Sequence, residues 1–251
     1  MNFFYKLLER ISRLLIKLIP TYYKNNHKFQ NKNQITNTNF ILKLLKKKIN
    51  PNFILDIGCG YGEWFLKCYN FFPNSKYLLY DANKFNQKKL RELKKKYPSI
   101  IYKICLLSNE IKDLKFYNMG YGSSVYEEKT SFERTVEQIT STTLDIELKD
   151  LPINTTNNII KLDVQGSEID ILRGLKDKIN LFEVIILETS LKEYNKNSPL
   201  FFNVINYMES KNFCFYDLCD LKRLGNENSI LVQFDSVFVK KNSKLLNFDF
   251  C

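Results

Sequence analysis

The sequence predicts an α/β fold in which a mostly parallel β-sheet carries helices on both faces. Short apolar runs, typical of buried strands, alternate with longer segments of helical periodicity, and this alternation indicates a parallel sheet. The 251 residues are 44% hydrophobic, which is enough for a large core and excludes general disorder. The direction of the last two expected strands is open, since both could be antiparallel. The expected strands are residues 52–57, 76–80, 100–107, 158–162, 184–187, 213–218 and 236–240, with helices beginning near Glu63, Asn86, Ser167 and Ser198.

An N-terminal extension precedes this pattern. Residues 3–19 place apolar side chains at helical spacing with most charges on the opposite face, which predicts an amphipathic helix. A polar linker over residues 21–39 and a helix over residues 40–48 follow. We assign residues 1–49 to a helical extension and residues 50–251 to one α/β domain. A basic amphipathic helix can lie on an anionic membrane surface, but packing on its own domain or on a second copy of the chain is the commoner arrangement.

The charge and the cysteines restrict the partners. The net charge of +11 is compatible with nucleic acid, a membrane or a phosphorylated substrate, but we attribute it to a general abundance of Lys, Asn, Ile, Phe and Tyr. The six cysteines form no Cys-x-x-Cys pair and His27 is the single histidine, so we expect no zinc site. The sequence shows no signal peptide and no apolar stretch of about 20 residues that could span a membrane. We therefore expect a cytoplasmic protein with reduced thiols.

The strongest local motif is the segment 56–62, Asp-Ile-Gly-Cys-Gly-Tyr-Gly, directly after the first strand. Its glycines allow a tight turn and a close approach of the backbone to a ligand. A dinucleotide fingerprint would need a glycine at position 63, where the chain has Glu63. S-adenosylmethionine (AdoMet) has no phosphate and carries a sulfonium and an ammonium, so acids beside the loop suit it. Asp56 and Glu63 therefore favour AdoMet over NAD.

The second strand ends in Asp81, an acid that can accept hydrogen bonds from both hydroxyls of an adenosyl ribose. The alternative is that Asp81 only caps the following turn. Cys105 and Leu106, at the end of the third strand, are placed to flank an adenine. The cofactor residues predicted from the loop and these strand ends are Asp56, Gly58, Gly60, Tyr61, Gly62, Asp81, Ala82, Cys105 and Leu106.

Several further motifs follow one another along the chain from residue 122 onward. They are Gly-Ser-Ser at 122–124, Thr-Thr-Leu-Asp at 142–145, Ile-Ile-Lys-Leu-Asp-Val-Gln-Gly-Ser-Glu at 159–168, Ile-Leu-Arg-Gly at 171–174, Glu188, and Tyr-Asp at 216–217. Together they resemble the signature of FkbM methyltransferases, over roughly residues 50–241. One departure is Asp-Ala-Asn at 81–83, where the family more often has Glu-Pro; an aspartate can still hold a ribose.

The resemblance implies a Rossmann-like class I methyltransferase fold with a seven-stranded sheet and an antiparallel last strand. It also implies O-methylation of a hydroxyl on a small, sugar-like acceptor, such as a nucleotide-activated sugar or a glycan of bacterial surface polysaccharide synthesis, and adds Ser124 to the cofactor residues. Two other functions stay open, a nucleic-acid methyltransferase and a non-catalytic AdoMet-binding module. Against the first, the segment 163–166 is Asp-Val-Gln-Gly rather than the Pro-Pro motif of base amino-methylation, and no proline precedes a cysteine.

Four residues are candidates for the chemistry at the acceptor: Asp163, Glu168, Glu188 and Lys161. Asp163 and Glu188 follow neighbouring strands at the edge where open α/β sheets bind ligands. Either could accept the proton of the hydroxyl directly. Alternatively, both could bind Mg²⁺, which would lower the pKa of the hydroxyl. A purely structural role is the third possibility, with Lys161 and Asp163 as an ion pair and Glu168 as a helix cap.

Overall fold

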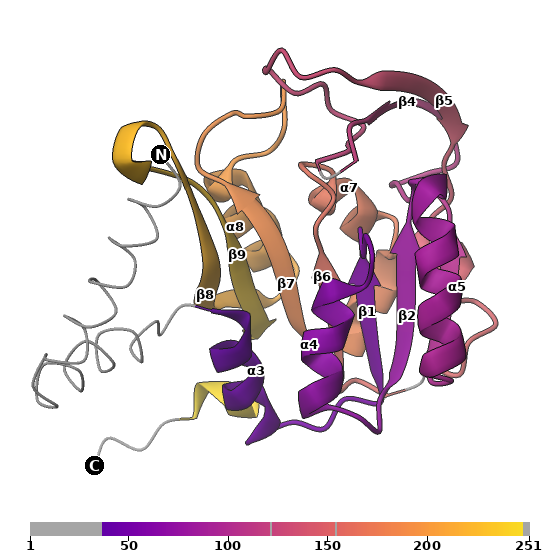
Figure 1. The fold of residues 1–251 in the computed structure, drawn as a ribbon. Coiled ribbons are helices and arrows are strands. Elements are labelled where there is room, and N and C mark those ends of the chain that lie inside the picture. The colour runs from indigo at the N-terminus through magenta and orange to yellow at the C-terminus, as the bar shows by residue number, and fades with distance from the viewer. Residues whose placement is uncertain (1–36, 121, 154, 248–251) are drawn as a thin grey trace, which may run out of the picture. The chain divides into compact units, whose positions relative to one another are not determined.

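The computed structural model describes residues 37–120, 122–153 and 155–247. The expected amphipathic helix over residues 3–19 lies outside the described residues, as does most of the linker. A seven-stranded sheet forms the centre of the fold, with the strand order β3-β2-β1-β6-β7-β9-β8 (Figure 1). Its strands are β3 (Ile100–Ile104), β2 (Lys76–Asp81), β1 (Phe53–Ile57), β6 (Asn158–Leu162), β7 (Phe182–Ser190), β9 (Ile230–Lys240) and β8 (Phe213–Leu224).

The first five strands in the chain to join this sheet pair in parallel. β9 is antiparallel to both of its neighbours, β7 and β8. This is the mostly parallel, Rossmann-like sheet of class I methyltransferases, as expected. The antiparallel direction that the sequence left open belongs to β9. Because β9 runs against β7, the beginning of β9 lies at the edge where the parallel strands end.

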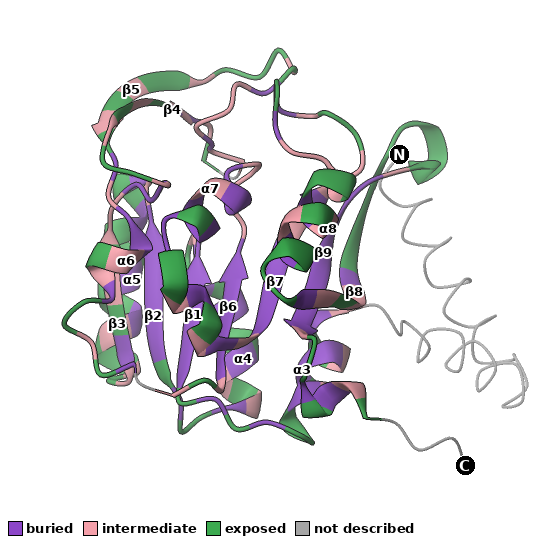
Figure 2. Ribbon diagram, turned by 180° about the vertical axis from the view of Figure 1, so that it is seen from behind, coloured by how far each residue is buried: buried purple, intermediate pink, exposed green. Residues whose placement is uncertain are grey.

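Helices cover both faces of the sheet (Figures 1 and 2). α3 (Thr38–Lys46), α4 (Glu63–Phe71) and α5 (Gln87–Lys96) pack on one face, and α6 (Leu144–Glu147), α7 (Glu168–Arg173) and α8 (Phe201–Ser210) pack on the other. Neighbouring residues of a central strand point to different faces of the sheet. In β1, Ile54 packs in the core beneath α3, α4 and α5, and Leu55 packs in the core beneath α6, α7 and α8. Strands buried on both faces must be apolar throughout, which is why they form continuous apolar runs.

The structure corrects the sequence prediction at four places. The third strand ends at Ile104 rather than 107, and the last helix begins at Phe201 rather than near Ser198. The last two strands are longer than expected, because they form a hairpin that continues beyond the parallel strands. A separate antiparallel hairpin of β4 (Asp113–Asn118) and β5 (Thr135–Thr140) was missed. Short 3-10 helices lie at Lys84–Asn86, Lys176–Leu181, Asn226–Asn228 and Lys244–Leu246.

The helix expected over residues 40–48 is α3, two residues earlier. The Asn37 side chain caps it by accepting from the backbone N–H of Phe40. Thr38 is hydrogen-bonded to the Asp220 carboxylate of β8 through both its backbone N–H and its hydroxyl. The domain boundary between residues 49 and 50 stays a prediction. Among the described residues, no helix has both the length and the apolar character needed to cross a bilayer.

Candidate active site

A cleft of about 550 Å³ opens at the carboxyl ends of the parallel strands. Its walls include the loop after β1, the ends of β2, β6 and β7, and the beginning of β9. The strand order reverses between β2, β1 and β6, and open α/β sheets bind ligands at such a switch point. The β4–β5 hairpin lies beyond this edge of the sheet (Figure 1), and Phe116 of β4 contributes to the lining.

The loop after β1 is fixed by backbone contacts. The N–H groups of Gly58 and Cys59 both donate to the carbonyl of Tyr80, at 2.8 and 3.1 Å. Gly58 has a φ of +76°, and a Cβ on it would lie 1.9 Å from the carbonyl oxygen of Asp163. Gly60 has a φ of +53°, and a Cβ there would meet nothing within 4 Å. The loop therefore passes tightly over the end of β6 at Gly58 and opens to the cleft at Gly60.

Asp81 joins the loop to the end of β2. Its carboxylate accepts from the N–H of Gly60 and from the N–H of Asn83, each at 2.7 Å. Burial raises the pKa of Asp81, and these hydrogen bonds act against the increase. Each carboxylate oxygen can accept two hydrogen bonds, so Asp81 retains the capacity to accept from a pair of ligand hydroxyls.

Asp56 lines the floor of the cleft and is 1% exposed. Burial raises its pKa to about 7, against the attraction of the Lys161 ammonium. Its Oδ2 has no hydrogen-bond partner among the described residues. A buried carboxylate oxygen without a donor is costly, and a ligand cation or ammonium would satisfy it. The part of the cleft around Asp56 therefore suits the positively charged AdoMet better than the pyrophosphate of a dinucleotide.

Three acids stand side by side at the edge of the sheet. Leu162 pairs with Leu187, so Asp163 comes next to Glu188, and Glu188 pairs with Asp235 of β9. Side chains in one row across neighbouring strands point to the same face. All three line the cleft, so the sheet register itself assembles this acid row.

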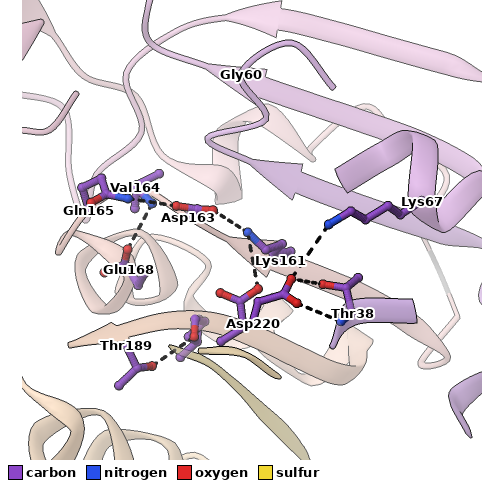
Figure 3. Close-up of polar contacts among 12 residues, drawn as sticks. Thr38, Gly60, Lys67, Lys161, Asp163, Val164, Gln165, Glu168, Thr189 and Asp220 are labelled. Carbon is purple, nitrogen blue, oxygen red and sulfur yellow. Dashed lines mark hydrogen bonds and ion pairs between the residues drawn. The ribbon is translucent and has the colours of Figure 1, made fainter. Parts of the chain in front are cut away.

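Lys161 decides how the acid row is charged. Its ammonium lies 2.6 Å from Asp163 Oδ2 (Figure 3). The same ammonium lies 3.8 Å from Asp235 Oδ2, and the Lys161 side chain is 5% exposed. Burial opposes the charge of Lys161, but the Asp163, Asp235 and Asp56 carboxylates outweigh burial and hold its pKa well above the ordinary value. Burial likewise opposes the charge of Asp163, but Lys161 holds the pKa of Asp163 below its ordinary value.

Glu188 behaves in the opposite way. Burial raises the pKa of Glu188 well above the ordinary value, and the nearby carboxylates of Asp163 and Glu168 add to the increase. Within the row, Lys161 therefore favours the ionised form of Asp163, whereas burial and the neighbouring carboxylates favour the protonated form of Glu188. Neighbouring acids whose pKa values are pushed apart can serve as an acceptor and a donor of hydrogen bonds to one ligand hydroxyl.

Gln165 orients Asp163 and was not singled out in the sequence. Its φ of +58° is unusual for a residue other than glycine. Its carbonyl accepts from the Ser124 hydroxyl at 2.9 Å and from the Asn195 amide at 2.5 Å, while its own side-chain amide donates to Asp163 Oδ1 at 3.2 Å. Backbone strain of this kind persists only where surrounding contacts hold it, and here it directs an amide at the candidate base.

Glu168 shapes the loop before α7 and does not line the cleft. Its carboxylate accepts from the N–H groups of Val164 and Gly166, each at 3.1 Å (Figure 3). These contacts match the structural alternative for Glu168 more closely than a contact with the acceptor. Burial raises the pKa of Glu168 to about 7.

We expect Glu168→Gln to alter the pH dependence of stability. A carboxyl whose pKa is 4.5 when unfolded and about 7 when folded binds extra protons in the folded state. It therefore contributes stability below pH 4.5 that is lost progressively as the pH rises to about 7. The glutamine Oε1 can still accept from the N–H groups of Val164 and Gly166, as Oε1 of Glu168 does, but the side chain does not titrate, so the variant should lose less stability than the wild type across this window. Urea unfolding from pH 4.5 to 8 measures the difference; parallel curves would contradict it.

The structure brings most of the predicted site residues together. Every predicted cofactor residue except Gly62, and every predicted catalytic residue except Glu168, lines the cleft. The main residue that the sequence analysis missed is Asp235. It directly precedes the last expected strand, and if that strand is antiparallel, its beginning lies at the same edge of the sheet as the ends of the parallel strands. The other lining residues that were missed include Trp64, Glu128, Tyr194, Asp220, Lys222 and Gln233.

Comparison with solved structures gives low identities. A precorrin-6y C5,15-methyltransferase from Geobacter metallireducens is 12% identical, with 80% of this chain and 87% of that chain covered and a TM-score of 0.46. Methyltransferase FkbM from Methylobacillus flagellatus is 14% identical, with 74% and 44% covered and a TM-score of 0.46, so this chain spans less than half of that protein. TrmK from M. capricolum, in complex with S-adenosyl-homocysteine, is 13% identical, with 81% and 68% covered and a TM-score of 0.45.

Comparison at the level of families is more specific. No curated protein matches the chain. The family model of the methyltransferase FkbM domain matches residues 57–215, which is more than half of the chain and includes the glycine loop, Asp81, Asp163 and Glu188. The chain belongs to the FkbM methyltransferase family.

Proposed function

We propose that this protein is an AdoMet-dependent O-methyltransferase acting on a hydroxyl of a small, sugar-like acceptor. The observation that carries the proposal is the meeting, in one cleft, of an acid-flanked glycine loop and a row of acids with opposite pKa shifts. When bound, AdoMet supplies an electrophilic methyl group. The protein has to hold it, align the acceptor oxygen, exclude water and take up one proton.

The loop end of the cleft fits the cofactor. The unpartnered Asp56 oxygen suits the ammonium, directly or through water, and Asp81 suits the ribose hydroxyls. The open face of Gly60 allows the ligand to approach the backbone closely. Cys105 and Leu106 at the end of β3 are suited to flank the adenine, and Tyr61, Ala82 and Ser124 line the same part of the cleft.

The acid row fits the acceptor. Asp163, whose ionised form Lys161 favours, accepts the proton of the attacking hydroxyl, and Glu188, whose protonated form burial favours, is suited to donate a hydrogen bond that orients this hydroxyl. A low pKa does not disqualify Asp163 as the base, because the attacking oxygen becomes strongly acidic as it bonds to the methyl group. Lys161 and Gln165 act on Asp163 and hold its carboxylate in position.

We prefer this metal-free route to binding of Mg²⁺ by Asp163 and Glu188. One oxygen of Asp163 contacts the Lys161 ammonium and the other accepts from Gln165. A divalent cation bridging Asp163 and Glu188 would have to displace Lys161 or lie against its charge. Carboxylate sites for Mg²⁺ without an adjacent ammonium are electrostatically better.

The cellular setting of the proposal is bacterial surface polysaccharide synthesis in the cytoplasm, with a nucleotide-activated sugar or a glycan as the acceptor.

The rival functions are a nucleic-acid methyltransferase, with RNA as a possible substrate, and a module that binds AdoMet without catalysis. The acid row argues against a module that only binds AdoMet, because binding of the cofactor alone requires none of these three acids. Methylation of a sugar but not of RNA, followed by mass spectrometry with AdoMet as methyl donor, separates the three. Association of residues 3–19, predicted as an amphipathic helix, with a membrane surface, or of two copies of the chain with each other, would be compatible with each of these functions.

Replacing Asp81 with alanine is expected to weaken AdoMet binding by about 10- to 100-fold, because hydrogen bonds to a charged group contribute about 1.5–3 kcal/mol. The change also releases the Gly60 N–H that the carboxylate holds. Calorimetric titration with AdoMet, S-adenosylhomocysteine and NAD is the measurement. Asp113→Ala, at an exposed position of β4, is the control and should bind normally. Tighter binding of NAD, or unchanged AdoMet affinity in Asp81→Ala, would refute the cofactor assignment.

A further inference from the structure

The charge of the cleft is opposite to the charge of the chain. The chain carries a net charge of +11, yet acids outnumber lysines among the lining residues. The acids are Asp56, Glu63, Asp81, Glu128, Asp163, Glu188, Asp220 and Asp235, and the lysines are Lys67, Lys161 and Lys222. Even with Glu188 protonated, a phosphate brought to the acid row would face the carboxylates of Asp163 and Asp235, and repulsion between like charges is strong in a partly buried site.

The lysines of the cleft do not offset this repulsion. Lys161 is bound to Asp163 and also faces Asp235. The ammonium of Lys67 lies 4.0 Å from Asp220 Oδ2, and Figure 3 shows these two side chains directed at each other. Lys222 of β8 pairs with Gln233 of β9, its charge helps to lower the pKa of Asp163, and its ammonium lies 5.5 Å from the ring centre of Tyr194. This single ammonium does not offset the larger number of acids among the described lining residues.

Besides Asp56 Oδ2, two buried polar atoms of the lining residues have no hydrogen-bond partner among the described residues. Gln233 is 2% exposed, and although its Nε2 donates to the Ser190 hydroxyl at 3.3 Å, its Oε1 receives no hydrogen bond from any described residue. Trp64 is 8% exposed, and its indole N–H finds no acceptor in the described part of the chain. Such groups are rare in folded proteins, and a ligand is one explanation for them. One group here needs a donor and the other an acceptor, and a hydroxyl can be both.

Gln233 belongs to the acceptor end of the cleft. It precedes Asp235 by two residues on β9, so their side chains point to the same face. The pairing of β9 with β7 places Gln233 beside Ser190 and Asp235 beside Glu188. Gln233 therefore lies on the same face of the sheet as Glu188, two residues further along the paired strands, so one ligand could contact both side chains.

Given the proposed O-methylation, we infer that the acceptor enters the cleft as an uncharged polyhydroxyl group recognised by Gln233 and Asp235, and that phosphate is kept out. The neutral sugar end of a glycan meets this description. In a nucleotide-activated sugar, the diphosphate would have to remain outside the acid row. Gln233 and Asp235 are then specificity-determining residues, which the sequence analysis did not include.

The test compares two forms of each acceptor. A panel of hexoses and deoxyhexoses is offered to the full chain with AdoMet, each sugar as its methyl glycoside and as its 1-phosphate, and methyl transfer is followed by mass spectrometry. For a sugar that is methylated, we expect kcat/KM to be at least about 10-fold higher for the glycoside than for the phosphate, since 10-fold corresponds to about 1.4 kcal/mol of repulsion. Asp235→Asn should reduce this ratio, and a ratio does not depend on how much of the variant is folded.

Gln233→Leu supplies the second arm. We expect it to raise the KM for the glycoside by about 10-fold, while AdoMet affinity stays unchanged. Gln138→Leu, the same substitution at an exposed position of β5, should leave both constants unchanged. Preference for the phosphate, or an unaltered KM in Gln233→Leu, would overturn the inference and leave O-methylation standing. Normal AdoMet binding with no transfer to any sugar form would instead overturn the proposed function, and the inference with it.

Discussion

Replacing Asp163 with asparagine is expected to lower kcat by about 10²- to 10⁴-fold, the range typical for loss of a general base. Asparagine retains the shape of the side chain and can still accept from Lys161, but it cannot take up a proton. The affinity for AdoMet should change little, because Asp163 is assigned to the acceptor. The melting temperature should also change little, since Asp235 and Asp56 remain as counter-charges for buried Lys161.

The measurement is methyl transfer under single-turnover conditions, with AdoMet titrated separately by calorimetry. Asp177→Asn, at an exposed position of the 3-10 helix Lys176–Leu181, is the control and should retain full activity. A kcat within a few-fold of the wild type would make Lys161 and Asp163 a structural ion pair, and Glu188 would become the next candidate for the base. Adding EDTA to the wild type tests the other route: loss of activity that Mg²⁺ restores would make Asp163 a metal ligand.

Local sequence was sufficient for the parallel part of the fold. A strand buried on both faces must be apolar along its length, so β1, β2 and β6 are visible as short apolar runs with an acid in or directly after their last two residues. The acids at these ends, Asp81 and Asp163, were therefore placed at the correct edge of the sheet. The segment 56–62 likewise predicted a ligand-binding turn, because alternating glycines directly after a strand are typical of loops that bind a nucleotide or a related cofactor.

The features that sequence did not reveal depend on distant contacts. β5 has the sequence Thr-Val-Glu-Gln-Ile-Thr and is largely exposed, so no apolar run marks it, and its partner β4 is 16 or more residues away along the chain. Asp235 and Gln233 reach the cleft only because β9 runs antiparallel, a direction that the residues of β9 do not encode. Gln165 has a positive φ because Ser124 and Asn195 bind its carbonyl, and both lie at least 30 residues away.

The glycine loop supports the second large effect, which concerns Gly58. An alanine Cβ at this position would lie 1.9 Å from the carbonyl oxygen of Asp163 and 2.8 Å from its carbonyl carbon, and both are backbone atoms. Neither can yield without moving the end of β6, which carries the candidate base. Residues other than glycine also pay about 1–2 kcal/mol for the left-handed conformation, and overpacking adds typically 1–3 kcal/mol.

We therefore expect Gly58→Ala to lower the free energy of unfolding by about 2–5 kcal/mol and to abolish measurable AdoMet binding. Gly60→Ala is the matched control for the stability term, because Gly60 has the same handedness at a φ of +53° but its Cβ would meet nothing within 4 Å. It should cost only the conformational part, about 1–2 kcal/mol. Urea unfolding of the two variants beside the wild type gives the comparison. Equal destabilisation of both variants would mean that the handedness of the loop alone sets the cost and that the contact of Gly58 with Asp163 is relaxed in solution; a larger loss for Gly58→Ala would show that the loop and the end of β6 are packed as one unit, so that the cofactor and the candidate base are held in register.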